Sequence, residues 1–146
     1  MNSGESVIIN HQRNSLKYFK ADEDGIYQLN QTIFSPNSIE DVTICPSEEY
    51  LAFSTRNNEQ HLHKNNINVF SHLATYTCSS GYAHFITFSR DCSWLAYICT
   101  SKQVILYKNM DPFTFIQSLN FSSIPSNVKI SDQTMLITYQ NSAGVN

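Results

Sequence analysis

Few residues in this chain have types and spacings that could do chemistry, and His61 and His63 are the strongest pair. Two imidazoles at alternate positions of an extended segment point to one face, where they could bind a metal ion, and His72 could lie nearby. Two histidines do not complete a metal site. We therefore predict no metal ligand in this segment.

The two histidines lie in a polar stretch, residues 57–66, that has no counterpart in a later repeat. It predicts an extended, solvated loop, and long loops on a rigid scaffold often carry binding residues. We expect a partner-contact loop here, which includes Asn57, Asn58, His61, His63 and Lys64.

Catalytic groups and phosphate-binding loops are not evident elsewhere. Asp22-Glu23-Asp24-Gly25 is similar to the start of a calcium loop, but the later oxygen ligands are missing, so a hairpin turn with Gly25 at positive φ explains it better. The serines lack a Gly-x-Ser-x-Gly elbow, and the four glycines are isolated. The sequence predicts no catalytic residue and no cofactor, which favours a protein that is not an enzyme.

The composition argues against several other function classes. Only 14% of residues are charged and the net charge is -3, which disfavours nucleic acid as a partner. The apolar runs are short, which disfavours membrane insertion. The N-terminus has no basic residue and leads into no long apolar segment, so we expect a cytoplasmic protein. The cysteines (Cys45, Cys78, Cys92 and Cys99) form no CxxC pair, and we expect reduced, buried thiols.

An internal repeat organises the chain. Residues 50–54 and 94–98 match at a spacing of 44, and each follows a strand-like triplet at the same distance. Residues 7–9 and 16–20 align with 95–97 and 104–108 at twice that spacing. A partial copy, with residues 128–132 and 135–139, follows at spacings of 41 or 42.

The repeated segments are short, rich in β-branched and aromatic residues and separated by polar turns, which predicts strands joined as antiparallel neighbours. We predict an all-β fold, a β-propeller segment of about three four-stranded antiparallel blades. It forms a single domain over residues 1–146, with units at 5–33 (partial), 39–78, 82–121 and 126–140 (partial), which hold three, four, four and two strands.

Residues 88–97, followed by 103–108, are similar to the second and third strands of a WD repeat, and residues 45–52 repeat part of the pattern. The Trp-Asp positions hold Phe19-Lys20, Phe70-Ser71 and Tyr107-Lys108, and the Gly-His pair that opens a repeat is absent. The aromatic positions predict a packed blade core, which consists of Tyr50, Phe53, Phe70, Phe88, Trp94, Tyr97 and Tyr107.

The resemblance implies a protein-interaction scaffold. We do not expect about three blades to close a ring. The expected partners are therefore other protein subunits or the remainder of a longer propeller. An assembly that covers open ends and a head-to-tail dimer are further alternatives. The alternative function is a propeller-based enzyme or small-ligand receptor, against which the scarcity of carboxylates and imidazoles on the predicted inner strands counts.

Overall fold

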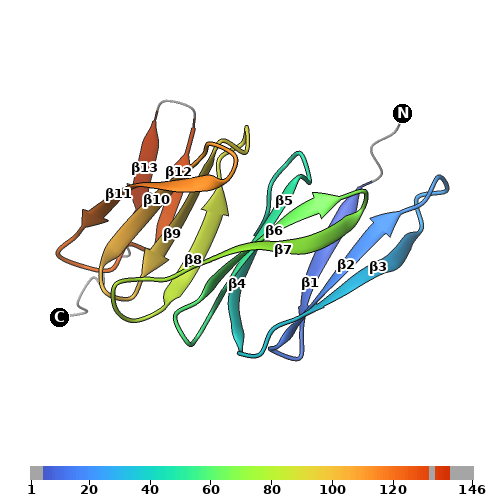
Figure 1. The fold of residues 1–146 in the computed structure, drawn as a ribbon, viewed down its shortest axis with the longest axis horizontal. Helices are drawn as coiled ribbons and strands as arrows, with labels where there is room; N and C mark the ends of the chain where they lie inside the picture. The colour runs from blue at the N-terminus through green and yellow to red at the C-terminus, as the bar shows by residue number, and fades with distance from the viewer. Residues whose placement is uncertain (1–4, 132–133, 139–146) are drawn as a thin grey trace, which may run out of the picture.

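The computed structural model describes residues 5–131 and 134–138, and the regular elements in that part of the chain are β-strands (Figure 1). No long apolar helix that could cross a membrane occurs among these residues. The strands form four antiparallel sheets that lie side by side along the longest axis of the molecule (Figure 1). The predicted all-β class is therefore confirmed.

Strands pair in chain order within each sheet. Sheet 1 contains β1 (Ser6–His11), β2 (Ser15–Ala21) and β3 (Tyr27–Phe34). Sheet 2 contains β4 (Ile39–Ile44), β5 (Tyr50–Thr55), β6 (Gln60–Asn66) and β7 (Val69–Tyr76). Sheet 3 contains β8 (Ala83–Phe88), β9 (Trp94–Cys99), β10 (Gln103–Asn109) and β11 (Phe113–Asn120). Sheet 4 contains β12 (Asn127–Ile130) and β13 (Met135–Thr138).

Sheets 2 and 3 are built on one template. Their four successive strands have 6, 6, 7 and 8 residues in both sheets. Strands β1 to β3 have 6, 7 and 8 residues, and so correspond to the second, third and fourth strands. A break in the pairing register follows Tyr18, Leu62 and Leu106, at the spacing of 44 that the sequence shows. Equivalent positions in the three sheets can therefore be compared directly.

The hydrophobic cores lie between adjacent sheets. Successive side chains of a strand point to opposite faces of the sheet, so a central strand contributes to both neighbouring cores: Leu51 and Phe53 pack toward sheet 1, whereas Ala52 packs toward sheet 3. The predicted core aromatics follow this arrangement. Six are buried and Trp94 is half-buried, packed against the core between sheets 3 and 4 with the Lys108 ammonium 5.5 Å from its ring centroid.

Glu48 connects sheet 1 to sheet 2 from the turn between β4 and β5. One carboxylate oxygen accepts a hydrogen bond from the Ser6 hydroxyl, and the other accepts one from the Tyr18 hydroxyl at 3.3 Å. The Lys20 ammonium lies 4.0 Å from the same carboxylate. Burial, together with this negative charge, raises the pKa of Tyr18. Sheet 1 is thus fixed to sheet 2 by polar contacts as well as by its apolar face.

The expectation of reduced thiols is wrong, because the four cysteines form the disulfides Cys45–Cys92 and Cys78–Cys99. Their Cα atoms are 5.5 and 6.0 Å apart, within the range that a disulfide spans. Each bond links a cysteine that follows a strand of sheet 2 to a cysteine of sheet 3: Cys45 follows β4, and Cys78 follows β7. Cys45 and Cys92 lie in turns at one end of these sheets, whereas Cys78 and Cys99 lie at the other end. Packing of adjacent sheets brings together cysteines that are distant in sequence.

The turn between β2 and β3 is the predicted hairpin turn. Gly25 has a φ of +78°, and one carboxylate oxygen of Asp22 accepts hydrogen bonds from the backbone N–H groups of Asp24 at 3.0 Å and Ile26 at 2.9 Å. These hydrogen bonds lower the pKa of Asp22, with the Ile26 N–H the largest contribution. The acidic residues thus close a tight turn.

Sheet 4 differs from the predicted alignment by one residue. Val128 pairs with Ile137, as Ile86 pairs with Tyr97 in sheet 3, so Met135 corresponds to Leu95 and not to Trp94. A shift of one residue exchanges the two faces of a strand. Met135 and Ile137 accordingly pack on sheet 3. Of the expected unit at 126–140, residues 132–133 and 139–140 lie outside the described residues.

Candidate functional site

The predicted partner-contact loop is mostly a strand. Residues 60–66 form β6, and only Asn57, Asn58 and Glu59 lie before it, in the connection from β5. Asn58 is held in place, because its side-chain amide donates to the Cys78 carbonyl at 3.0 Å and its oxygen accepts from the Cys78 N–H at 2.8 Å. His63 is 7% exposed, so it cannot contact a partner directly. Lys64 is half-buried.

The polar sequence of β6 concealed a regular third strand. The strand has polar residues at most positions, yet it lies between β5 and β7 and is covered on both faces. There is consequently no insertion at residues 57–66. Phe70 lies in β7, the fourth strand of sheet 2, and not at the end of the third strand as predicted.

Three imidazoles gather on sheet 2. The His72 ring lies 6.0 Å from His61 and 5.5 Å from His63 between centroids, and both residues of β6 stack on Phe53 at 4.9 and 5.4 Å. Burial, with the neighbouring imidazoles, lowers the pKa of His63 to about 4, and its Nδ1 has no hydrogen-bond partner. Among the described residues, no group of three or more His, Cys, Asp or Glu side chains is arranged to hold a metal ion. His63 therefore packs as a neutral aromatic ring near neutral pH.

The first strands of sheets 2 and 3 carry a second polar cluster. The Asp41 carboxylate accepts from the backbone N–H of Ile86 at 2.9 Å and from its neighbour Val42 at 2.9 Å. Burial raises the pKa of Asp41, although these hydrogen bonds oppose the shift. Glu40 forms an ion pair with Arg56. Asp41 thus joins β4 to β8, and its carboxylate has a structural role.

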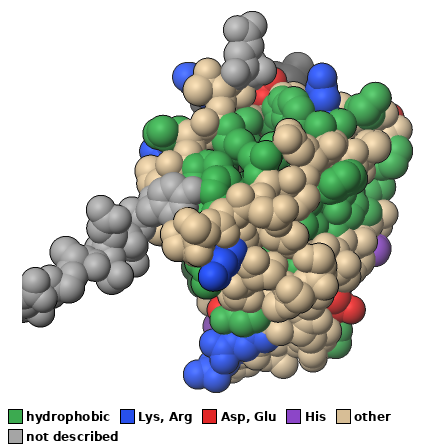
Figure 2. All heavy atoms as spheres, turned by 90° about the vertical axis from the view of Figure 1, so that its left-hand side faces the viewer, with side chains coloured by type: hydrophobic (Ala, Val, Ile, Leu, Met, Phe, Trp, Pro, Cys, Tyr) green, Lys and Arg blue, Asp and Glu red, His purple; other side chains and the backbone are tan. Residues whose placement is uncertain are grey.

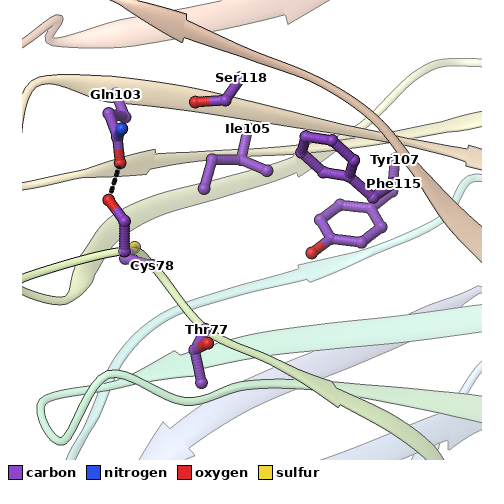
Figure 3. A pocket seen from close by; sticks show the side chains of 8 residues that line it. Thr77, Cys78, Gln103, Ile105, Tyr107, Phe115 and Ser118 are labelled. Atoms are coloured by element: carbon purple, nitrogen blue, oxygen red, sulfur yellow. Dashed lines mark hydrogen bonds between the residues drawn. The ribbon is translucent and has the colours of Figure 1, made fainter.

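A cavity of about 310 Å³ lies on sheet 1 and another of about 370 Å³ lies between sheets 2 and 3. The second one is lined by the segment after β7 and by β10 and β11, with the Tyr107 and Phe115 rings at one end and the Gln103–Ser79 hydrogen bond at the other (Figure 3). Its lining residues are Thr77, Cys78, Ser79, Gln103, Ile105, Tyr107, Phe115 and Ser118. No acid or base lines it, so it suits a small ligand with apolar and hydrogen-bonding groups.

The face of sheet 1 that points away from sheet 2, called here the entry face, is an open end of the kind that the sequence predicted, although its residues were not identified. Val7 and Ile9 on β1 are 39% and 46% exposed. The equivalent residues of sheet 2, Leu51 and Phe53, are 0% and 2% exposed, because sheet 1 covers them. Those of sheet 3, Leu95 and Tyr97, are fully buried against sheet 2.

The entry face extends across the other strands of sheet 1. Val7, Ile9, Phe19 and Tyr27 line the cavity of about 310 Å³ on this face, and Leu29 is 52% exposed. The apolar side chains at alternate positions of residues 7–9, together with the repeat alignment, were the signal that could have identified it. At the opposite end of the molecule, hydrophobic side chains also gather at the surface, where Ile116 of β11 and Leu136 of β13 are exposed (Figure 2).

Solved structures of similar fold were found, whereas no protein-family model and no curated protein matches the chain. A functionally unknown protein from Desulfotomaculum acetoxidans matches with a TM-score of 0.65 at 20% identity, over 82% of this chain and 40% of that protein. A putative 6-phosphogluconolactonase from Bacteroides fragilis matches with a TM-score of 0.67 at 14% identity, over 82% and 37%. A protein from Lactobacillus plantarum matches with a TM-score of 0.68 at 12% identity, over 88% and 43%.

These likenesses show the fold. The chain spans about two fifths of the length of the three proteins that it matches. Together with the repeated four-stranded sheets, they establish that this chain has the fold of a partial β-propeller, with sheets 1 to 4 as successive blades.

Proposed function

We propose that this chain is a protein-interaction scaffold, a WD-repeat-like propeller segment that acts within a longer propeller or a multi-subunit assembly and has no catalytic activity. The observation that carries the proposal is the entry face of sheet 1. Side chains that are buried at the equivalent positions of the next two sheets are exposed there. Contiguous apolar surface of this kind typically marks a protein interface.

The extent of the fold supports the same proposal. Propellers gain stability when neighbouring blades cover each other, and this chain aligns with 37% to 43% of the length of its structural neighbours. Other protein segments would complete that set of blades. A scaffold needs no reactive group, and the carboxylate of Asp41 is already engaged by two backbone N–H groups.

The proposal is tested by placing a charge on the entry face. Ile9→Glu should abolish capture of specific partners from the native source, because a carboxylate would be buried without a counterion in the interface. Ile67→Glu is the matched control, since Ile67 is 95% exposed in the turn between β6 and β7. Both variants should melt as the native chain does. A native chain that is monomeric by light scattering and captures a small molecule or metal instead of protein would refute the scaffold.

The cytoplasmic location expected from the sequence stays a prediction. Disulfides persist in oxidising compartments and are uncommon in the cytosol, so the two disulfides argue for an oxidising location. Thiol labelling of the protein in its native source distinguishes the two locations. Labelled cysteines in the unfolded native protein would support the cytoplasm, and unlabelled ones the oxidising compartment.

A second candidate function, a propeller-based enzyme or small-ligand receptor, is favoured by the cavity between sheets 2 and 3. The similar Bacteroides fragilis protein is described as a putative 6-phosphogluconolactonase, so phosphorylated sugar lactones are the first substrates to assay. Hydrolysis by this chain that is lost in Ser118→Ala, which removes a hydroxyl group from the cavity lining, would favour the enzyme. Binding without turnover that is lost in Phe115→Ser would favour the receptor.

A further inference from the structure

Sheet 1 has two edge strands, β1 and β3, and the edge formed by β1 has no strand beside it in the described part of the chain. The Ala21 N–H donates to the Glu5 carbonyl at 2.9 Å, which fixes the groups that β1 directs toward β2. Bonding groups alternate between the two edges of an antiparallel strand. The backbone N–H and C=O groups of Ser6, Ile8 and Asn10 therefore point to the opposite edge, away from β2.

The same edge is occupied in the next two sheets. In sheet 2 the Cys45 N–H donates to the carbonyl of Tyr50, the equivalent of Ser6, at 2.9 Å. In sheet 3 the Ser89 N–H donates to the carbonyl of Trp94, again the equivalent of Ser6, at 3.0 Å. Cys45 and Ser89 directly follow β4 and β8, which both have six residues. The repeat thus defines what is missing beside β1.

We propose that the free edge of β1 binds an antiparallel strand from a partner polypeptide, which completes sheet 1 to four strands. This inference rests on the proposed scaffold function and names the chemistry of its partner. Each described strand of this chain is already paired within its own sheet, so none of them is available for the position. Exposed strand edges are ready templates for such pairing.

The repeat also specifies the sequence of the partner strand. Strands β4 and β8 end in the same pattern, Val42-Thr43-Ile44 and Ile86-Thr87-Phe88. Thr43 pairs with Ala52, the equivalent of Ile8. Val42 and Ile44 pair with Phe53 and Leu51, the equivalents of Ile9 and Val7, and pack beside the core between sheets 1 and 2. A partner strand of apolar-Thr-apolar pattern would extend the entry face in the same way.

The experiment uses a capped peptide with the sequence of residues 38–44 as the probe, added in excess to the full chain. Amide hydrogen exchange at Ser6, Ile8 and Asn10 should be fast in the free chain and slower by about tenfold or more with the peptide. Amides of the equivalent positions in β5 should be slow in both states. The control peptide carries Thr43→Pro, which removes the N–H that would face β1, and it should give no protection.

A pair of variants tests the edge from the other side. Asn10→Pro removes one donor at the free edge, whereas Asn10→Ala keeps the N–H and removes the same side-chain hydrogen bond to the Ile39 carbonyl. Peptide binding should be weakened several-fold in the proline variant only. Equal protection by both peptides, or slow exchange of these β1 amides in the free chain, would overturn the proposal. Protection that grows with chain concentration in the absence of peptide would replace the partner strand with a second copy of this chain.

The outcomes separate this inference from the scaffold function. If Ile9→Glu loses its partners but the peptide protects nothing, the scaffold stands and the edge proposal is wrong. If the peptide protects β1 but Ile9→Glu keeps all partners, the edge binds strands and the scaffold reading of the entry face is wrong.

Discussion

The side-chain amide of Gln31 pairs with the backbone of Phe70 as a neighbouring strand would. Its Oε1 accepts from the Phe70 N–H at 2.8 Å, and its Nε2 donates to the Phe70 carbonyl at 2.8 Å. The two residues lie on the outer strands of sheets 1 and 2, beside the Tyr18–Phe70 edge-to-face contact at 5.1 Å. One side chain thus satisfies two backbone groups across the interface.

Gln31→Leu should therefore loosen sheet 1. The substitution leaves two backbone groups without partners, which costs about 1–3 kcal/mol. Urea denaturation should show a lower midpoint, and hydrogen exchange should be faster in sheet 1 than in sheet 3. Gln28→Leu is the control, because the Gln28 amide donates to Asp22 in the turn between β2 and β3, and this hydrogen bond does not involve sheet 2. An equal loss of stability in both variants would contradict the role of the Phe70 contact.

Reduction of the disulfides should destabilise the chain unequally. Their partners are 47 and 21 residues apart, and the chain-entropy model gives about 4 kcal/mol for the longer loop and about 3 kcal/mol for the shorter one. The Cys45→Ser/Cys92→Ser variant should thus have a lower melting temperature than Cys78→Ser/Cys99→Ser. If reducing agent leaves the melting temperature of the native chain unchanged, the disulfides do not contribute to stability.

His63→Phe should make stability less dependent on pH. The pKa of His63 falls from an ordinary value of 6.5 in the unfolded chain to about 4 in the fold. The unfolded state therefore binds a proton that the native state excludes, and stability falls by about 3 kcal/mol as the pH drops from 6.5 to 4. Urea titrations at several pH values should show a smaller fall in this variant than in the native chain.

The same substitution should stabilise the chain at neutral pH, because it removes a buried Nδ1 that lacks a hydrogen-bond partner. Phe19 and Tyr107 occupy the equivalent positions of sheets 1 and 3, so an aromatic ring suits the site. His11→Phe serves as the control, since His11 lies on β1, outside the histidine cluster. If His11→Phe flattens the pH profile as much as His63→Phe does, the cluster is not the cause.

Gly81→Ala and Gly25→Ala form a matched pair. Both glycines have positive φ, at +71° and +78°, so alanine strains the backbone at both positions. A Cβ on Gly81 would also collide with the Thr100 side chain, whereas nothing lies near one on Gly25. Gly81→Ala should therefore lower the melting temperature more. Equal effects would show that Thr100 moves aside without cost.

The sequence predicted the sheets better than the surface. Alternating apolar residues and the spacing of 44 identified the blades, because strand burial imposes both patterns. Strand β6 was missed, since Gln60, His61 and His63 are polar residues that the structure nevertheless covers. The disulfides were missed because they join different sheets, and sequence spacing does not encode which sheets pack together. The sequence predicted open ends, but the residues of the entry face were not identified because they have the same pattern as a buried strand, and only comparison between sheets shows that they are exposed.

The two disulfides at opposite ends of the interface between sheets 2 and 3 have a mechanical consequence. When the chain is pulled at its termini, sheet 1, strands β10 and β11 of sheet 3 and sheet 4 lie outside the disulfide loops and can extend fully, but the segment from Cys45 to Cys92 remains bridged. Force spectroscopy of the oxidised chain should then record a contour length shorter than that expected for the full number of residues. A reducing agent should restore the full contour length. The disulfide-bridged part of the chain would therefore resist extension under load, whereas the parts on either side of it would extend.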